Sequence, residues 1–215
     1  MIIAIVNQKG GCGKTSSSVA LTYWLHKQGK NLLLIDADAQ ESSSHWLSGM
    51  SNVSFKTIHD PEEIFEQAAA SAEDYDAVVI DGPGSFGEHT KSALLVADLA
   101  IIPVQPSELD LAATKQVIRL VHNVQKIRNG APKAAVFVNR AEKRSLLLKE
   151  TRSVLSNIPG VKLLNAVIYR RAVIADSPGQ HTTIFNMSGQ AAADAAADYS
   201  ALFEEALAYG KQIHS

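Results

Sequence analysis

Short apolar runs alternate along the chain with longer stretches whose apolar positions recur at helical spacing. The runs that indicate strands buried on both faces cover residues 2–6, 31–35, 77–80, 99–104, 134–138 and 162–168. The stretches with helical spacing cover residues 14–28, 61–72, 90–97, 111–128, 145–155 and 190–213. This alternation predicts an α/β fold with a mostly parallel twisted sheet and helices on both of its faces.

The chain has no internal repeat, low-complexity linker or break in composition, so we expect one domain spanning residues 1–215. In folds of this class, ligands bind at the carboxyl ends of the parallel strands. Candidate functional residues should therefore come directly after the apolar runs. Polar clusters do follow the first three of these runs.

The first cluster is a glycine-rich loop, residues 9–15 (KGGCGKT), which we call the phosphate loop. Its glycines would let backbone N–H groups surround phosphate oxygens, and the positive end of the following helix points at the same oxygens. Lys14 would neutralise phosphate charge and Thr15 would hold Mg²⁺. A simple glycine-rich turn is the alternative, but turn chemistry does not account for Lys14 and Thr15. The expected nucleotide contacts are Gly10, Gly11, Cys12, Gly13, Lys14, Thr15 and Ser16.

Cys12 is the single cysteine of the chain. A lone cysteine excludes a disulfide framework and a multi-cysteine metal site within one chain. Two interpretations of Cys12 remain. It is either a loop residue whose backbone N–H binds phosphate, which we favour, or a reactive thiol or the sole ligand that each subunit gives to a bridged cluster.

The second and third clusters are acidic. Asp36 and Asp38 follow the second apolar run, and Asp81 follows the third. Carboxylates beside a polyphosphate need a cation between them, and Mg²⁺ supplies it. We therefore expect Asp81 to bind Mg²⁺, and Asp38 to orient the attacking water or the magnesium shell. The alternative is that these residues cap helices or form turns at strand ends.

The phosphate loop resembles the deviant Walker A box, K-G-G-x-G-K-[ST], of the ParA/MinD ATPases. This resemblance implies a P-loop NTPase fold and a catalytic role for Lys9, Lys14 and Asp38. Lys9 would cross a dimer interface to the partner's nucleotide, although a solvated lysine is the alternative. Residues 36–40 resemble the switch I of the family with Ala39 in place of its usual proline, and residues 81–85 resemble switch II.

Two further segments extend the resemblance. Residues 101–111 resemble a proline-containing stretch of small plasmid-partition ATPases, although two prolines also simply fix a loop. Asn139 and Arg140 follow the fifth apolar run, where relatives contact the nucleotide base, although asparagine is also common in turns. The family implies binding of ATP with Mg²⁺, a nucleotide-sandwich homodimer, slow hydrolysis and an adaptor protein that stimulates it.

Charge bears on the choice of partner. With 20 Lys and Arg against 22 Asp and Glu, the net charge of −2 excludes a strongly basic nucleic-acid protein but permits a local patch. Members of the family bind nucleoid DNA without sequence preference, which basic side chains achieve by neutralising phosphates. A solvated helix face is the alternative. The candidate DNA contacts are Arg144, Lys149, Arg152, Arg170 and Arg171.

Membrane attachment is the competing possibility. The apolar start of the chain is too short for a signal peptide, so we expect a cytoplasmic protein. The DNA binding of the ParA/MinD ATPases that the chain resembles implies that it is also nucleoid-associated. The last predicted helix is acidic, which anionic lipid would repel, and we expect it to pack on the domain. Two other functions stay open: an ATP-driven filament protein, and a small-molecule synthetase on the same fold.

Overall fold

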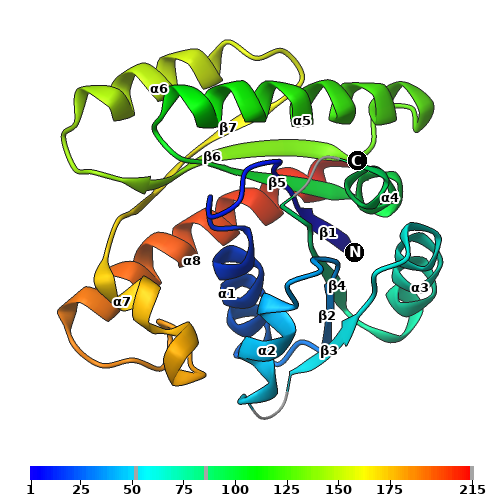
Figure 1. The fold of residues 1–215 in the computed structure, drawn as a ribbon, viewed down its shortest axis with the longest axis horizontal. Helices are drawn as coiled ribbons and strands as arrows, with labels where there is room; N and C mark the ends of the chain where they lie inside the picture. The colour runs from blue at the N-terminus through cyan, green and yellow to red at the C-terminus, as the bar shows by residue number, and fades with distance from the viewer. Residues whose placement is uncertain (51–52, 85–86, 214–215) are drawn as a thin grey trace.

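A computed structural model describes residues 1–50, 53–84 and 87–213 (Figure 1). Seven strands form one sheet in the order β3-β2-β4-β1-β5-β6-β7, and every neighbouring pair is parallel. The predicted α/β fold is therefore confirmed. The strands are β1 (Ile2–Ile5), β2 (Leu32–Asp36), β3 (Ser54–Thr57), β4 (Ala77–Asp81), β5 (Leu99–Val104), β6 (Lys133–Ala141) and β7 (Lys162–Tyr169).

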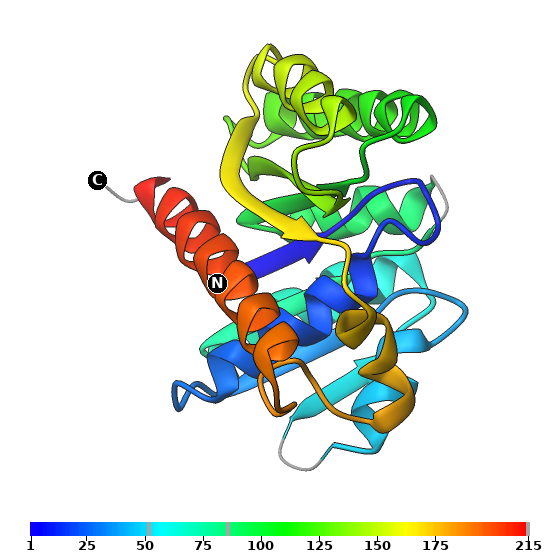
Figure 2. The same cartoon turned by 90° about the vertical axis from the view of Figure 1, so that its left-hand side faces the viewer.

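Helices cover both faces of the sheet (Figures 1 and 2). Alternate residues of the central strands enter different cores: Ile2 and Ala4 pack with α3 to α6, whereas Ile3 and Ile5 pack with α1 and α8. The helices are α1 (Lys14–His26), α2 (Ser42–Ser48), α3 (Pro61–Asp74), α4 (Glu88–Val96), α5 (Glu108–Ile127), α6 (Leu146–Ser156), α7 (Ala172–Asp176) and α8 (Gln190–Gly210), with short 3₁₀ turns at Pro178–Gln180 and Lys211–Ile213.

The order of the strands determines where a ligand can bind. The chain leaves β1 on one side of the sheet to form β2, β3 and β4, and it later forms β5, β6 and β7 on the other side. Connections that diverge from a central strand leave a crevice at its carboxyl end. The phosphate loop follows β1 directly, so it lies in that crevice.

Three elements were not predicted from the pattern of apolar residues. Strand β3 has the sequence SFKT and all four residues are exposed, because it is the short edge strand of the sheet. Helix α2 is serine-rich, and α7 has five residues with no buried side chain. Elements with little apolar surface of their own leave no periodic pattern in the sequence.

The C-terminal helix α8 packs on the domain, as expected. Tyr199, Leu202 and Phe203 are buried against the sheet face that α1 also covers (Figure 2). Within the part of the chain that the structure describes, no helix combines the length and apolar character that a membrane span requires.

Strand β7 forms the other edge of the sheet and carries a bulge. The five residues of β7 from Leu163 to Val167 oppose the three residues of β6 from Val136 to Val138. Two side chains bond to the backbone exposed there. Glu205 of α8 accepts hydrogen bonds from the N–H groups of Asn165 (2.7 Å) and Ala166 (3.1 Å), and Arg152 of α6 donates to the carbonyls of residues 164 and 165.

Replacement of Glu205 should therefore weaken the fold. We expect Glu205→Ala to lower the free energy of unfolding by about 1–2 kcal/mol, because it removes a charged acceptor from two backbone N–H groups. Urea denaturation followed by circular dichroism measures this change. Glu204→Ala, at an exposed position of the same helix, is the matched control and should lie close to wild type. Equal stability of the two variants would contradict the assignment.

Candidate nucleotide-binding site

The phosphate loop joins β1 to α1 and has a backbone that glycine favours. Gly11 and Gly13 have φ angles of 74° and 98°, in the left-handed region. A Cβ atom on Gly13 would lie 2.0 Å from Nδ2 of Asn139, so the site also excludes side chains sterically. No side chain caps the first turn of α1, which leaves its N–H groups for an anion.

Two amide side chains hold this loop from neighbouring strands. Asn139, buried at the end of β6, donates from Nδ2 to the carbonyl of Cys12 at 2.7 Å. Gln105, directly after β5, donates to the carbonyl of Gly11 at 2.6 Å. The Oδ1 atom of Asn139 accepts from the N–H of Arg140, so both polar atoms of this side chain bond to the protein itself. The support by Gln105 and Asn139 was not predicted, because it depends on segments far apart in the sequence.

Both lysines of the phosphate loop have partners within the chain. Lys14 is buried, and its ammonium donates to the carbonyl of Lys9 at 3.2 Å. Lys9 forms an ion pair with Asp110 in the first turn of α5, and the Asp110 side chain is fully buried. Ser107 also donates to this carboxylate. Asp110 was not a candidate in the sequence, since it lies in a different segment from the loop.

The two acidic strand ends meet beside the loop. Asp36 and Asp81 are paired residues of β2 and β4, and both are fully buried. Asp36 accepts from the N–H groups of Asp38 and Ser44. Burial, and secondly the charge of Asp36, raise the pKa of Asp81 to about 7, while hydroxyl groups nearby act in the opposite direction. Two buried carboxylates on adjacent strands repel each other, so the pair favours the binding of either a proton or a cation.

The donor set around Asp81 fits a hard divalent cation. Oδ1 of Asp81 accepts from Ser18 at 2.9 Å, but Oδ2 is buried and without a hydrogen-bond partner. The hydroxyl group of Thr15, in the phosphate loop, lowers the pKa of the Asp81 carboxyl group. Among the described residues no cluster of three or more His, Cys, Asp or Glu side chains could hold a metal. The oxygen donors of Thr15 and Asp81 fit Mg²⁺, which they would hold together with oxygens of the nucleotide.

Asp38 connects the two predicted switch segments. Its Oδ2 accepts from the N–H of Gly84 at 2.9 Å, and its Oδ1 accepts from the N–H of Gln40 at 3.0 Å. The predicted switch II continues to Ser85, which lies outside the described residues. One carboxylate thus joins the loop after β2 to the loop after β4.

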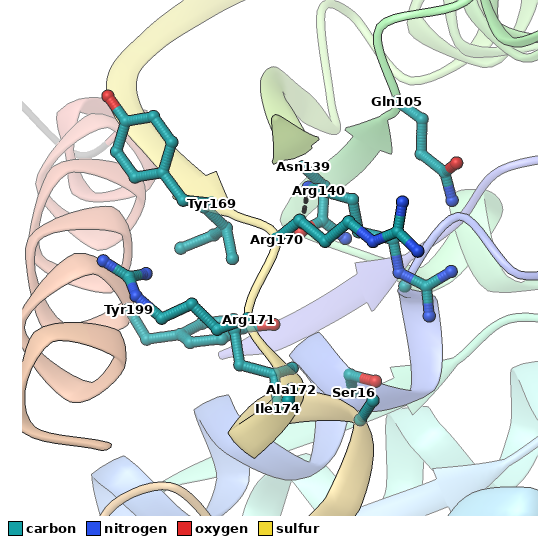
Figure 3. Close-up of a pocket in the computed structure, with 13 residues that line it drawn as sticks. Ser16, Gln105, Asn139, Arg140, Tyr169, Arg170, Arg171, Ala172, Ile174 and Tyr199 are labelled. Atoms are coloured by element: carbon teal, nitrogen blue, oxygen red, sulfur yellow. Dashed lines mark hydrogen bonds between the residues drawn. The ribbon is translucent and has the colours of Figure 1, made fainter. Parts of the chain in front are cut away.

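Two of the cavities that adjoin the phosphate loop bear on nucleotide binding. The larger, about 700 Å³, is lined by Ser16, Asn139, Arg140, Ile168 and Arg170, among others (Figure 3). The second, about 380 Å³, is lined by phosphate-loop residues and by Asp38, Gly84 and Arg140. The first is large enough for a nucleoside, and the second lies where the end of a polyphosphate chain would extend.

The predicted DNA contacts differ in how far they are engaged within the fold. Arg144 and Lys149 are exposed near the start of α6. Arg152 bonds to the β7 backbone, and Arg171 forms an ion pair with Asp198 and lies over the ring of Tyr169. Arg170 lines the larger cavity.

Comparison with known proteins agrees with this site. The pattern that describes the CobQ/CobB/MinD/ParA nucleotide binding domain matches residues 3–184. The chain belongs to this family. It is 32% identical over 202 residues to the maintenance of carboxysome distribution protein A of Halothiobacillus neapolitanus, covering 89% of this chain and 91% of that relative. It is 27% identical over 219 residues to the chromosome-partitioning ATPase Soj of Thermus thermophilus, covering 85% and 86%.

Solved structures share the fold. An ATP complex of a Cyanothece McdA variant has a TM-score of 0.77 at 16% identity and covers 96% of each chain. The Mg-ADP complex of the septum site-determining protein MinD from Pyrococcus horikoshii has a TM-score of 0.74 at 23% identity, also over 96% of each chain.

The raised pKa of Asp81 predicts a pH dependence in the absence of Mg²⁺. Because the folded-state pKa of about 7 exceeds the ordinary 3.8, the native protein retains a proton that the unfolded chain releases between these values. The unfolding free energy of wild type, relative to Asp81→Asn, should therefore fall as pH rises from 3.8 to about 7. Urea unfolding over a pH series measures this difference. Asp74→Asn, at an exposed carboxyl, should not change the slope, and a parallel pH profile of wild type and Asp81→Asn would contradict the prediction.

Proposed function

We propose that this protein is a Mg²⁺-dependent ATPase of the ParA type that positions or segregates a cargo. The observation that carries the proposal is the phosphate loop, held from β5 and β6, with Thr15 and the unpartnered oxygen of Asp81 next to it. The larger cavity offers space for the nucleoside. The relatives named for carboxysome distribution and chromosome partitioning support a cargo-positioning role.

Each residue of the site has its own role in the proposed reaction. The N–H groups of the loop and the Lys14 ammonium bind the phosphate oxygens of ATP. Mg²⁺, held through Thr15 and Asp81, would draw charge from the β- and γ-phosphates. Asp38 orients the attacking water, because its bonds to the N–H groups of Gly84 and Gln40 fix its carboxylate between the two switches. From the resemblance to the ParA/MinD ATPases we expect slow hydrolysis.

We propose that ATP joins two copies of the chain face to face. In the structure Lys9 neutralises the buried carboxylate of Asp110 and keeps about a third of its side chain exposed. To reach a partner's nucleotide, Lys9 would exchange this carboxylate for phosphate oxygens. The exchange is favourable only when a phosphate faces it, which makes dimerisation depend on ATP.

The ATP-bound dimer would bind nucleoid DNA without sequence preference. Arg144 and Lys149 are exposed and free to neutralise DNA phosphates, and a dimer doubles their number. An adaptor protein on the cargo, a plasmid or a protein organelle, would then stimulate hydrolysis and release the dimer. We place this cycle in the cytoplasm, at the nucleoid, and not at a membrane, because α8 is acidic and its apolar face is buried.

Lys14 is the first residue to test. Lys14→Gln should weaken Mg-ATP binding about thirtyfold or more, because it removes a charge-assisted contact to phosphate. Isothermal titration calorimetry measures the affinity, and circular dichroism checks the fold. Lys27→Gln, at an exposed position just beyond the same helix, is the control. A Lys14→Gln protein with wild-type affinity would refute the site.

Lys9 tests the dimer separately. Lys9→Ala should bind ATP within about twofold of wild type, because Lys9 is engaged with Asp110 in the single chain. It should nevertheless fail to dimerise with Mg-ATP. Light scattering after size-exclusion chromatography reads the mass with ADP and with ATP. Asp110→Asn keeps Lys9 but removes the charge of its ion-pair partner, so this variant should still dimerise. An ATP-dependent dimer of Lys9→Ala would rule out the exchange.

A further inference from the structure

Two arginines line the larger cavity from neighbouring segments. Arg140 lies near the end of β6, with a φ of 53°, and Arg170 comes directly after β7. Both side chains are exposed. Figure 3 shows both extending across the cavity to the side where Gln105 lies, and Gln105 is bonded to the phosphate loop.

Among the described residues, neither guanidinium group has a carboxylate partner. In the ranges 1–50, 53–84 and 87–213 no ion pair joins Arg140 or Arg170 to a carboxylate. Two other basic residues do form ion pairs: Arg171 pairs with Asp198, and Lys9 pairs with Asp110. Two positive groups on one cavity wall repel each other, and an anion between them converts this repulsion into attraction. This wall of the larger cavity therefore favours an anionic ligand.

We propose that Arg140 and Arg170 together bind the phosphate chain of the nucleotide on its nucleoside side. This inference rests on the proposed function, because it assigns a second cationic wall to the same site. Arg140 lines both cavities, whereas Arg170 lines only the larger one. Arg170 should therefore act near the α-phosphate, which ATP and ADP share. The planar fork of a guanidinium group matches two phosphate oxygens, which an ammonium group does not.

The position of Arg170 favours this role over DNA binding. A DNA contact needs a side chain that projects from the surface to a backbone phosphate, as the exposed Arg144 and Lys149 can do outside both cavities. Arg170 instead shares a cavity with Ser16 and Asn139, two residues at the phosphate loop. Arg170 is thus a nucleotide-binding residue, and the DNA surface of the dimer does not need it.

The experiment compares nucleotide affinities of the full chain. By calorimetry, Arg170→Gln should bind Mg-ATP and Mg-ADP about tenfold more weakly than wild type, by a similar factor for both, because it loses a charge-assisted phosphate contact. Adenosine affinity should not change. Arg170→Lys should be intermediate, since it keeps the charge but loses the fork. Lys115→Gln, at an exposed position on α5 away from both cavities, is the control and should match wild type.

A second readout separates nucleotide from DNA. With ATP at saturating concentration, fluorescence anisotropy of a labelled 30-base-pair duplex (a length of about three helical turns) should give the same DNA affinity for Arg170→Gln and wild type. Unchanged ATP and ADP affinities in Arg170→Gln would overturn the inference, and a DNA defect alone would make Arg170 a DNA contact. If wild type itself failed to bind Mg-ATP, the proposed function would fall together with the inference, so the two failures are distinguishable.

Discussion

A backbone loop binds a polyphosphate more tightly when its conformation is fixed before the anion arrives. Here that constraint rests on two hydrogen bonds, from Asn139 to the carbonyl of Cys12 and from Gln105 to the carbonyl of Gly11. Both donors sit at the carboxyl ends of adjacent parallel strands, so the register of β5 and β6 sets the shape of the loop. The rigid sheet thereby removes ordering entropy from the binding step.

The carboxyl ends of the strands also carry charged groups whose partners would change when the nucleotide binds. Lys9 rests on Asp110, and Asp81 has a pKa raised to about 7 beside Asp36. We propose that both arrangements change when phosphate and Mg²⁺ bind. Binding would then be an exchange of ionic partners, and its selectivity would depend on how well the incoming group replaces the one that leaves.

The central strands and the phosphate loop could be predicted because their signals are local. Continuous apolar runs indicate buried parallel strands, and the glycine and lysine spacing of residues 9–15 carries its own chemistry. Gln105 and Asp110 acquire their roles from contacts across about a hundred residues of sequence, so no local pattern revealed them. The position of Asn139 after the fifth apolar run made it a candidate for contact with the base, but its bond to the phosphate loop depends on an equally distant segment. The candidate DNA contacts show the converse: Arg152 and Arg171 are basic in sequence but engaged within the fold.

The bulge in β7 has a consequence for assembly. An edge strand with free N–H and C=O groups is a template on which another chain can add a strand. In this protein Glu205 of α8 and Arg152 of α6 form hydrogen bonds to backbone groups in the middle of β7. A strand from another chain cannot pair with these backbone groups while they are bonded to Glu205 and Arg152, which disfavours growth of the sheet through this part of β7.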